Sequence, residues 1–371
     1  MGRFQFELAS RADDAELRSI LAATPMEGQV SMSFRREPSF FDAAAVEGDF
    51  HQVIVCRDSR VNRIAGFGCR SVRTMYVNGQ PTPIGYLSAL RALPEYRNRG
   101  LVARGYAFLQ QLHADGRTPL YLTTIAEGNE PALDILTSGR AGLPTYRFAG
   151  TYHTMVLSKG RRRFPNGAST SVEVRVATKD DLHDVLKLLH AAGPSRQFFP
   201  CYQEGDFFNE RAIFRDLTPS HLLLAFRDGQ LVGTLAGWDQ SAFKQSVVER
   251  YTSHLRWSRP LYNSWARLRR LPVLPPPEQS FHYLTAALCV VSDDDPAIFR
   301  ALLENLHTRA ATGPDDFLVM GLHESDPLFP LVQPYQLACY LTRTYLVCWD
   351  EGEPLLAQMD GRSTYLELGC L

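Results

Sequence analysis

Long apolar runs are missing from this sequence. No stretch of its 371 residues approaches the roughly 20 consecutive apolar residues that a membrane-spanning helix requires. Residues 1–17 contain no apolar run ahead of a small-residue cleavage site, so they do not form a secretion signal. Phe6 stands where a myristoylation signal needs Ser or Thr. We therefore expect a cytoplasmic protein with no membrane span.

Paired cysteines are missing as well. The seven cysteines are odd in number and widely scattered, with no CxxC pair and no histidine at metal-ligand spacing. Most of them, such as Cys56 and Cys289, lie in apolar runs. This is typical of buried free thiols in a reducing compartment. We predict neither disulfides nor a metal site.

An excess of charge of either sign is the third absence. The formal net charge is −1 and the isoelectric point is about 6.8, so no global field recruits nucleic acid or an anionic surface. No GxxxxGK[ST] run and no GxGxxG run after the first expected strand occurs, which argues against nucleotide-triphosphate and NAD sites. A charged ligand would therefore have to be recognised by a local group of side chains and not by the net charge of the protein.

The chain is long enough for two hydrophobic cores, and its pattern repeats. Residues 158–171 are polar, basic and rich in Gly, Ser and Pro, as an exposed linker would be. On either side a strand runs into a helix with a suitable N-cap, Ser10 in one copy and Thr178 in the other, an offset of 178 − 10 = 168. We expect domains at 1–157 and 172–350, followed by a tail at 351–371.

A larger offset farther along the chain indicates an insert in the second copy. Residues 90–93 match 286–289 and Glu130 matches Asp326, since 286 − 90 and 326 − 130 both give 196. The extra 28 residues are assigned to 243–271, where the apolar spacing predicts two amphipathic helices broken at Pro260. Its arginines suit a membrane surface or an acidic partner, but a packed insert with a solvated basic face is more common.

The segment LRALPEYRNRGLVA at residues 90–103 carries the clearest chemistry. It is expected to connect a strand to a helix near 101–114, followed by a strand near 120–125. Backbone amides at a helix start are unpaired and carry the positive end of the helix dipole, so they attract phosphate oxygens. Gly100 permits close approach, and Arg97 and Arg99 add charge. The turn therefore suits a pyrophosphate.

This arrangement resembles the GNAT superfamily of acyl-CoA-dependent N-acyltransferases. Residues 92–102, ALPEYRNRGLV, match the family run V-x-P-x-Y-R-x-x-G-x-G/A, although Val102 stands where the family prefers Gly or Ala. Asn129, Ala132 and Ile135 fill the family's second pattern, N-x-x-A-x-x-L. The resemblance covers about residues 4–157 and implies an α/β (α+β) fold of two tandem GNAT-like halves, each a mixed, mostly antiparallel twisted sheet flanked by helices. In arrangement the chain resembles mycothiol synthase, the enhanced-intracellular-survival acetyltransferases and N-myristoyltransferase.

The resemblance also implies which residues hold acetyl-CoA or another acyl-CoA, the expected co-substrate. The pantetheine arm would lie along residues 90–92 and against Asn129, and the pyrophosphate would lie in the turn at residues 97–103. These residues are Leu90, Arg91 and Ala92 for the arm, and Arg97, Asn98, Arg99, Gly100, Leu101, Val102 and Ala103 for the turn.

The second half has the opposite charge at the matching turn. At the offset of 196, Arg97 to Gly100 correspond to Asp293, Asp294, Asp295 and Pro296. Carboxylates there cap the helix but repel a pyrophosphate. We predict that only the first half binds acyl-CoA. The resemblance to tandem relatives implies that the second half walls the acceptor pocket or mediates oligomerisation, for example as a homodimer.

The catalytic groups are harder to assign. Attack of an amine on a thioester needs a proton acceptor, and departure of the thiolate needs an acid. The usual family tyrosine is replaced by Leu136, and a frequent carboxylate by Thr124. The candidates that remain are Glu127, Tyr146 and the terminal carboxylate of Leu371, while His51, His113 and His153 lack an evident partner pattern.

These observations favour an N-acyltransferase that moves an acetyl or short acyl group to a primary amine of a small molecule or peptide. A non-catalytic acyl-CoA sensor is the alternative, since the missing tyrosine and base suit it equally. An aminoacyl-tRNA-dependent transferase is disfavoured by the neutral isoelectric point and the retained RxxG turn.

Overall fold

The computed structural model describes residues 2–140, 142–158, 172–209, 212–269, 271–312 and 317–371. Residues 159–171, nearly all of the predicted linker, lie outside the described residues. Ser158 is the last residue of a strand.

The first half begins with a strand and a helix, as the sequence predicts, and it ends with a long strand. Its elements are β1 (Phe4–Leu8), α1 (Asp14–Ala23), β2 (Val30–Arg35), α2 (Phe40–Ala44), β3 (Phe50–Asp58), β4 (Arg63–Val77), β5 (Gln80–Ala92), α3 (Leu101–His113), β6 (Tyr121–Ala126), α4 (Glu130–Leu136) and β7 (Thr145–Ser158).

The second half follows a similar order with additions in its middle and at its end. Its elements are β8 (Val172–Val176), α5 (Leu182–Ala192), β9 (Phe199–Pro200), β10 (Leu222–Arg227), β11 (Gln230–Trp238), β12 (Gln245–Tyr251), α6 (Ser253–Arg269), β13 (Tyr283–Val291), α7 (Pro296–Thr312), β14 (Phe317–His323), α8 (Phe329–Val332), β15 (Gln336–Cys348) and α9 (Glu353–Ala357).

The two copies start with the same cap. Ser10 N donates to Asp13 Oδ2 at 2.8 Å, and Thr178 N donates to Asp181 Oδ2 at 2.7 Å. Each forms a capping box around a 3₁₀ turn that leads into α1 or α5. The predicted N-caps are therefore confirmed, with the serine or threonine and the aspartate in equivalent places.

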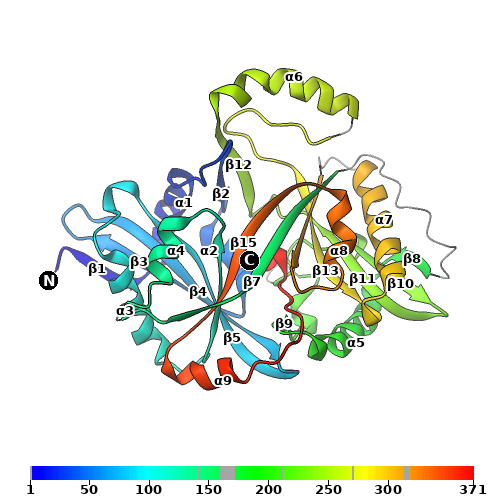
Figure 1. Cartoon of the computed structure of the whole chain (residues 1–371), viewed down its shortest axis with the longest axis horizontal. Coiled ribbons are helices and arrows are strands. Elements are labelled where there is room, and N and C mark those ends of the chain that lie inside the picture. Colours follow the sequence, from blue (N-terminus) through cyan, green and yellow to red (C-terminus); the bar gives the residue numbers. More distant parts are fainter. Residues whose placement is uncertain (1, 141, 159–171, 210–211, 270, 313–316) are drawn as a thin grey trace.

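One sheet runs through both halves (Figure 1). Among the described residues thirteen strands join it, in the order β1-β3-β4-β5-β6-β15-β7-β14-β13-β11-β10-β8, with β9 on β4. The last strand of each half has crossed over: β15 pairs with β6 of the first half, and β7 pairs with β14 of the second. β7 and β15 also pair with each other. The halves are therefore joined by backbone hydrogen bonds.

The sheet is mixed and mostly antiparallel, with helices on both faces. Its parallel pairs among the described strands are β5 with β6 and β13 with β14. On β3, Val53 and Val55 belong to a core with α1 and α2, whereas Ile54 belongs to a core with α3 and α4. This alternation places the two helix pairs on opposite faces. The predicted fold class is confirmed.

The inserted segment differs from its prediction. β12 pairs with β2 of the first half in a separate two-stranded sheet, so Val247 and Tyr251 are strand residues. α6 is one helix that continues through Pro260. The prediction of two helices broken at Pro260 is wrong. The apolar residues at 247, 248 and 251 do not distinguish a helix from a strand in so short a run, and pairing with β2 made the segment a strand.

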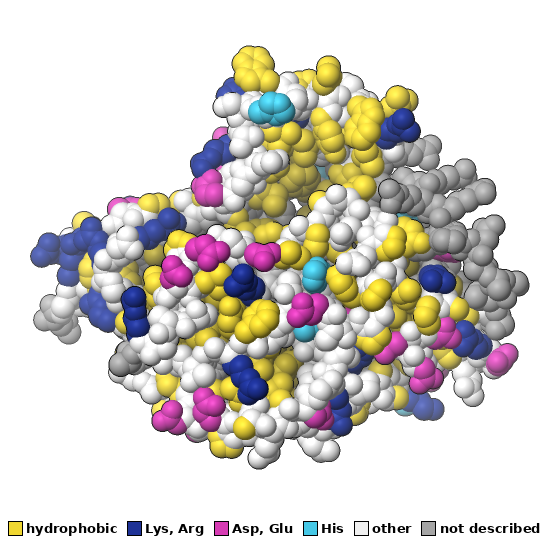
Figure 2. Space-filling view, viewed as in Figure 1, with side chains coloured by type: hydrophobic (Ala, Val, Ile, Leu, Met, Phe, Trp, Pro, Cys, Tyr) yellow, Lys and Arg dark blue, Asp and Glu magenta, His cyan; other side chains and the backbone are white. Residues whose placement is uncertain are grey.

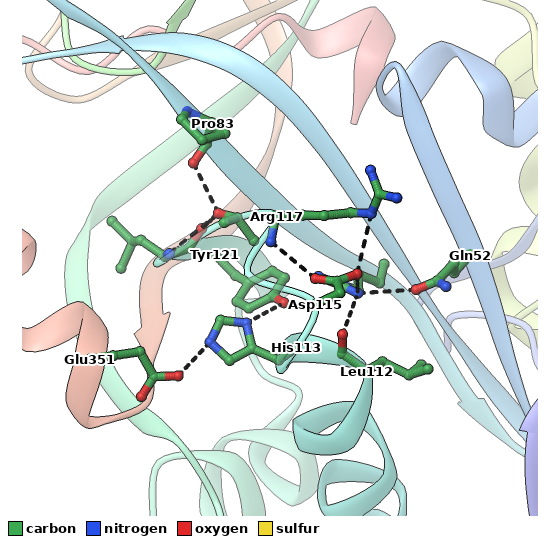
Figure 3. Close-up of polar contacts among 11 residues, drawn as sticks. Gln52, Pro83, Leu112, His113, Asp115, Arg117, Tyr121 and Glu351 are labelled. Atoms are coloured by element: carbon green, nitrogen blue, oxygen red, sulfur yellow. Dashed lines mark hydrogen bonds and ion pairs between the residues drawn. The ribbon is translucent and has the colours of Figure 1, made fainter.

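A polar network holds the end of α3 against the sheet and against the segment that follows β15 (Figure 3). His113 contacts Tyr121 Oη at 2.8 Å through Nδ1 and Glu351 Oε1 at 2.7 Å through Nε2. Asp115 accepts two hydrogen bonds from the buried Arg70 guanidinium, at 2.7 and 2.9 Å. These contacts fix the helix whose first turn carries the predicted phosphate site.

Two kinds of feature are absent from the part of the chain that the structure describes. No helix there is both long and apolar enough to cross a bilayer. No group of three His, Cys, Asp or Glu side chains there gathers as metal ligands would.

Candidate functional site

The turn between β5 and α3 has the backbone that a phosphate site needs. Gly100 lies in the left-handed region, with φ +66°, and no atom lies within 4 Å of where a Cβ would be. Asn98 is also left-handed, with φ 59°. The amides of residues 98–103 precede the first helical hydrogen bond, from Arg104 N to Gly100 O at 3.5 Å. They stand at the positive end of the α3 dipole.

The two arginines of this turn are exposed and held by the backbone. Arg97 Nε donates to Ala92 O at 3.3 Å, and Arg99 Nε donates to Glu95 O at 3.1 Å. Both bonds use the Nε atoms and leave the terminal nitrogens available to a ligand. The structure thus brings Arg97, Arg99 and Gly100 together at one surface, as the sequence predicts.

Beside this turn, β5 and β6 separate. They pair in parallel at Gly85, Tyr86 and Leu87, and the register stops there although β5 continues to Ala92. At the point of separation Ala89 has φ 53°, and two residues of β5 stand opposite Gly68 of β4 in a bulge. The remaining residues of β5, which include Leu90 and Arg91, therefore line an opening between two strands.

Asn129 lies at the start of α4. It is the N-cap residue of α4, and its carbonyl oxygen accepts from Ala132 N and Leu133 N at 3.1 Å. The side chain is exposed. Asn129 thus follows β6 just as Gly100 follows β5, the two strands that separate.

A buried polar cluster lies behind the bulge, on the α1 and α2 face of the sheet. Ser88 Oγ donates to Glu47 Oε2 at 2.6 Å, and Arg36 pairs with Glu47 Oε1. His51 Nε2 lies 3.9 Å from Glu47 Oε2, and this nitrogen has no hydrogen-bond partner among the described residues. Glu47 is 3% exposed. Ser88, one member of this cluster, directly precedes Ala89, where β5 separates from β6.

Burial and neighbouring charges determine the protonation states of Glu47 and His51. Burial alone would raise the pKa of Glu47, but Arg36, His51 and Lys244 together with the Ser88 hydrogen bond lower it below the ordinary value. Burial lowers the pKa of His51, against the attraction of Glu47. The carboxylate is therefore ionised and the imidazole neutral near neutral pH.

A small cavity of about 30 Å³ adjoins the cluster. Glu47, Arg73, Tyr86 and Leu371 are among its lining residues. Tyr86 Oη lies 3.2 Å from Thr124 Oγ1, so this hydroxyl bridges β5 and β6 at their point of separation. Burial raises the pKa of Tyr86, which keeps the phenol protonated.

The structure separates the three catalytic candidates named from the sequence. Leu371 lines the cavity, and its oxygen accepts from Lys244 Nζ at 2.9 Å. Glu127 is exposed at the end of β6, where its nearest ion partner is Arg343 at 4.0 Å. Tyr146 is half-buried, and its hydroxyl pairs with that of Tyr106 on α3. Only Leu371 stands next to Glu47.

The equivalent turn of the second half is shorter than the sequence alignment implied. The bulge at Leu288, with φ 51°, matches Ala89 at an offset of 288 − 89 = 199, whereas the helix starts match at 296 − 101 = 195. Four residues are therefore missing between strand and helix, and the uniform offset of 196 is wrong. Asp295 takes the place of Gly100; it caps Ala297 N at 2.7 Å and pairs with Arg227 at 2.8 Å.

The opening of the second half is also filled. Glu367 Oε2 accepts from Leu288 N at 2.9 Å and from Tyr365 Oη at 2.8 Å. Leu288 is the bulge residue that corresponds to Ala89. The chain's own segment around residues 364–368 thus lies beside β13, at the place that corresponds to the separated end of β5.

Comparisons with solved structures identify the fold. The chain resembles Saccharomyces cerevisiae N-myristoyltransferase with bound myristoyl-CoA, with a TM-score of 0.57, 11% identity, and coverage of 94% of this chain and 83% of that chain. It resembles a GCN5-related N-acetyltransferase from Sphaerobacter thermophilus, with a TM-score of 0.55, 12% identity, and coverage of 98% and 99%. It also resembles the GCN5-related glucosamine N-acetyltransferase region of a fungal multi-domain β-N-acetylglucosaminidase, with a TM-score of 0.61, 11% identity, and coverage of 92% and 38%.

These likenesses define a class of fold. The chain has the GCN5-related N-acyltransferase fold in two tandem halves, as its resemblance to that superfamily predicted. No protein-family model matches the sequence, and no curated protein is significantly similar to it.

Sequence reasoning missed most of the buried cluster. His51 was set aside for want of a partner, yet Glu47 lies four residues before it and contacts it. Glu47 could have been singled out from the sequence, because it is an acidic residue at the end of a short helical run rich in alanine and phenylalanine. Its contacts with Arg36 and Ser88 depend on the fold.

Proposed function

We propose that this protein is an N-acyltransferase that moves an acetyl or short acyl group from acyl-CoA to a primary amine of a small molecule or peptide, with its site in the first half. The observation that carries the proposal is the opening between β5 and β6 beside the Gly100 turn, with a polar cluster behind it. A phosphate turn at one end and proton-accepting groups at the other suit a long thioester that reaches through the sheet.

The first half would hold the co-substrate in order along β5. The amides of residues 98–103 with Arg97 and Arg99 would bind the pyrophosphate. Leu90, Arg91 and Ala92 would pair with the pantetheine arm through their free backbone edge, with Asn129 opposite. The thioester would then lie at Ala89, where the bulge turns a backbone amide out of the β ladder.

Three side chains would move the protons. The ionised Glu47 lines the cavity, so it suits the ammonium form of the acceptor, and the neutral His51 behind it would take the proton. The amine nitrogen would attack the thioester carbonyl to form the C–N bond, and the C–S bond would break. Tyr86 would donate its phenol proton to the departing thiolate, and the phenolate would regain a proton from the nitrogen, which loses its second proton as the amide forms. Leu371 stays a second candidate base, and removal of this residue would then abolish turnover that His51→Gln leaves intact.

The charges around the cluster favour an acceptor with an anionic group near its amine. Arg36 Nη1 is buried with no hydrogen-bond partner among the described residues. Arg91 lies close to Arg36; burial together with this like charge lowers the pKa of Arg91. A carboxylate on the acceptor would satisfy both guanidinium groups.

The test combines CoA binding with release of free thiol. Acetyl-CoA and longer acyl-CoA are offered with amine pairs that differ only in a carboxylate, such as an amino acid and its decarboxylated amine. Turnover with preference for the carboxylate-bearing member supports the proposal. Tight CoA binding without turnover on any amine would instead indicate an acyl-CoA sensor.

A matched pair of glycine variants tests whether the phosphate site lies at the Gly100 turn. Gly100→Glu adds a negative charge at φ +66° and should abolish CoA binding, whereas Gly229→Glu makes the same change at φ +76° in a hairpin of the second half. No atom lies within 4 Å of either added Cβ. Equal loss of binding in both variants would argue against the Gly100 turn as the phosphate site.

A further inference from the structure

One side of α6 presents large apolar side chains to solvent. Trp257, Leu261 and Leu268 are 84%, 82% and 81% exposed, and Trp265 is 49% exposed. Successive members are four, four and three residues apart, so they form one stripe along the helix. Single exposed apolar residues are ordinary on a protein surface, but a continuous stripe of this size marks an interaction site.

The stripe is not the side by which α6 packs on the rest of the chain. Ala266 on the opposite side is fully buried. Asn263 exchanges two hydrogen bonds with Leu274, at 2.9 and 3.0 Å, and Tyr262 Oη donates to Pro272 O at 3.1 Å. The returning segment therefore covers the inner side and leaves the stripe outside. We expected a packed insert with a solvated basic face; α6 does pack through its inner side, but the apolar stripe also faces solvent.

The charge of α6 is uniformly positive. Ser253–Arg269 contains four arginines and no aspartate or glutamate. Arg259 lies over the Tyr251 ring, at 5.7 Å, on the packed side. At 3.6 residues per turn, Arg256 and Arg267 fall along one edge of the stripe and Arg269 falls along the other. All three are exposed.

The position of α6 makes the stripe accessible to a flat surface. The helix projects from the body of the molecule, beyond β12 and β2 (Figure 1). The space-filling view shows hydrophobic side chains gathered on this projection with basic side chains beside them (Figure 2). The arginines on both edges of the stripe complement the phosphates of an anionic lipid surface, which adapts to the shape of a projecting helix.

We propose that α6 docks this protein on an anionic membrane surface. The helix would lie in the plane of the interface, with Trp257, Leu261, Trp265 and Leu268 at the boundary between headgroups and acyl chains. The arginines on both edges would contact lipid phosphates. A helix with a wide apolar stripe that contains tryptophan, flanked by arginine, has the composition of an interfacial helix. The proposal does not depend on the reaction in the first half.

The first experiment is flotation of the full-length protein with vesicles. Vesicles of phosphatidylcholine alone are compared with vesicles that also contain phosphatidylserine. Binding should be stronger to the anionic vesicles and should weaken as salt is added. Emission from Trp257 and Trp265 should shift to shorter wavelength on binding, while the buried Trp238 stays unchanged.

Variants separate the two contributions. Trp257→Ser with Leu261→Ser should lower vesicle affinity about tenfold or more, because two large side chains no longer leave water. Arg256→Glu with Arg267→Glu should remove the preference for phosphatidylserine. The control is Val61→Ser, a 62% exposed apolar residue in the turn between β3 and β4. Near-UV circular dichroism of the buried tryptophans checks that each variant is folded.

Two outcomes would overturn the proposal. One is equal binding of the parent and the Trp257→Ser, Leu261→Ser variant to anionic vesicles, or no binding of either. The other is a dimer in sedimentation velocity that this variant dissociates while vesicles bind neither form. The stripe would then be a contact between copies of this chain.

Discussion

The carboxylate of Glu367 accepts a hydrogen bond from the backbone amide of Leu288 at 2.9 Å, and both residues are buried. Leu288 is the strand bulge of the second half, in the place that Ala89 holds in the first. The same carboxylate oxygen accepts from Tyr365. The Glu367 side chain thus provides an acceptor for the backbone amide of Leu288. The corresponding residue of the first half, Ala89, lies where β5 and β6 separate.

Loss of the Glu367 side chain should destabilise the protein. Glu367→Ala leaves the Leu288 amide and the Tyr365 hydroxyl buried without an acceptor, which costs about 2–4 kcal/mol. Glu367→Gln keeps one acceptor oxygen and should cost less. Urea unfolding monitored by tryptophan fluorescence measures both, and equal stability of Glu367→Ala and the parent would contradict the role given to this contact.

Each chain should bind one acyl-CoA. The second half lacks four residues of the turn, and Asp295 stands where the first half has Gly100. Isothermal titration calorimetry should therefore give a stoichiometry of one, both for the parent and for Glu367→Gln. Two molecules bound per chain would refute the assignment of a single site.

Arg97 should contribute to CoA affinity mainly through its positive charge. Arg97→Ala should weaken CoA binding about tenfold at low salt, and the difference should shrink as salt rises. Arg11→Ala serves as the control, because Arg11 is exposed and pairs with Asp42 at 3.1 Å away from the turn. Parallel losses in the two variants would indicate a general effect of net charge.

The acyl transfer rate should depend on the protonation of His51. Burial lowers the pKa of His51 below its usual 6.5, so the neutral, proton-accepting form predominates above that range. kcat/KM should rise with pH on the acidic side, with a midpoint below pH 6.5. His51→Gln should lower kcat about 100-fold and remove this limb while leaving CoA affinity unchanged. A limb that survives in His51→Gln would exclude His51 as the base.

The contact between Arg70 and Asp115 should be a major source of stability for α3. The Arg70 side chain is fully buried, so Asp115→Ala leaves a buried charge with its main partner removed, at a cost of about 3 kcal/mol. Arg117→Ala, on the exposed neighbour that also contacts Asp115, should cost no more than about 0.5 kcal/mol. Thermal unfolding followed by circular dichroism compares the two variants.

Gly105 shows how tertiary packing explains a residue that local preference disfavours. A glycine within α3 lowers helix propensity by about 1 kcal/mol relative to alanine. In the structure a Cβ at Gly105 would lie 3.2 Å from Phe6 Cε1 of β1. The glycine therefore allows the close approach of helix and strand.

The sequence by itself determined the features whose signals are local. The capping boxes at Ser10 and Thr178 and the β5–α3 turn with Gly100 depend on residues a few positions apart, so spacing alone reveals them. The tertiary structure decided the rest. Ser88 meets Glu47 across 41 residues and Leu288 meets Glu367 across 79, while β7 and β15 change places between the halves. Such pairings, and the outward stripe of α6, follow from which surfaces the whole chain buries, and no local pattern encodes that choice.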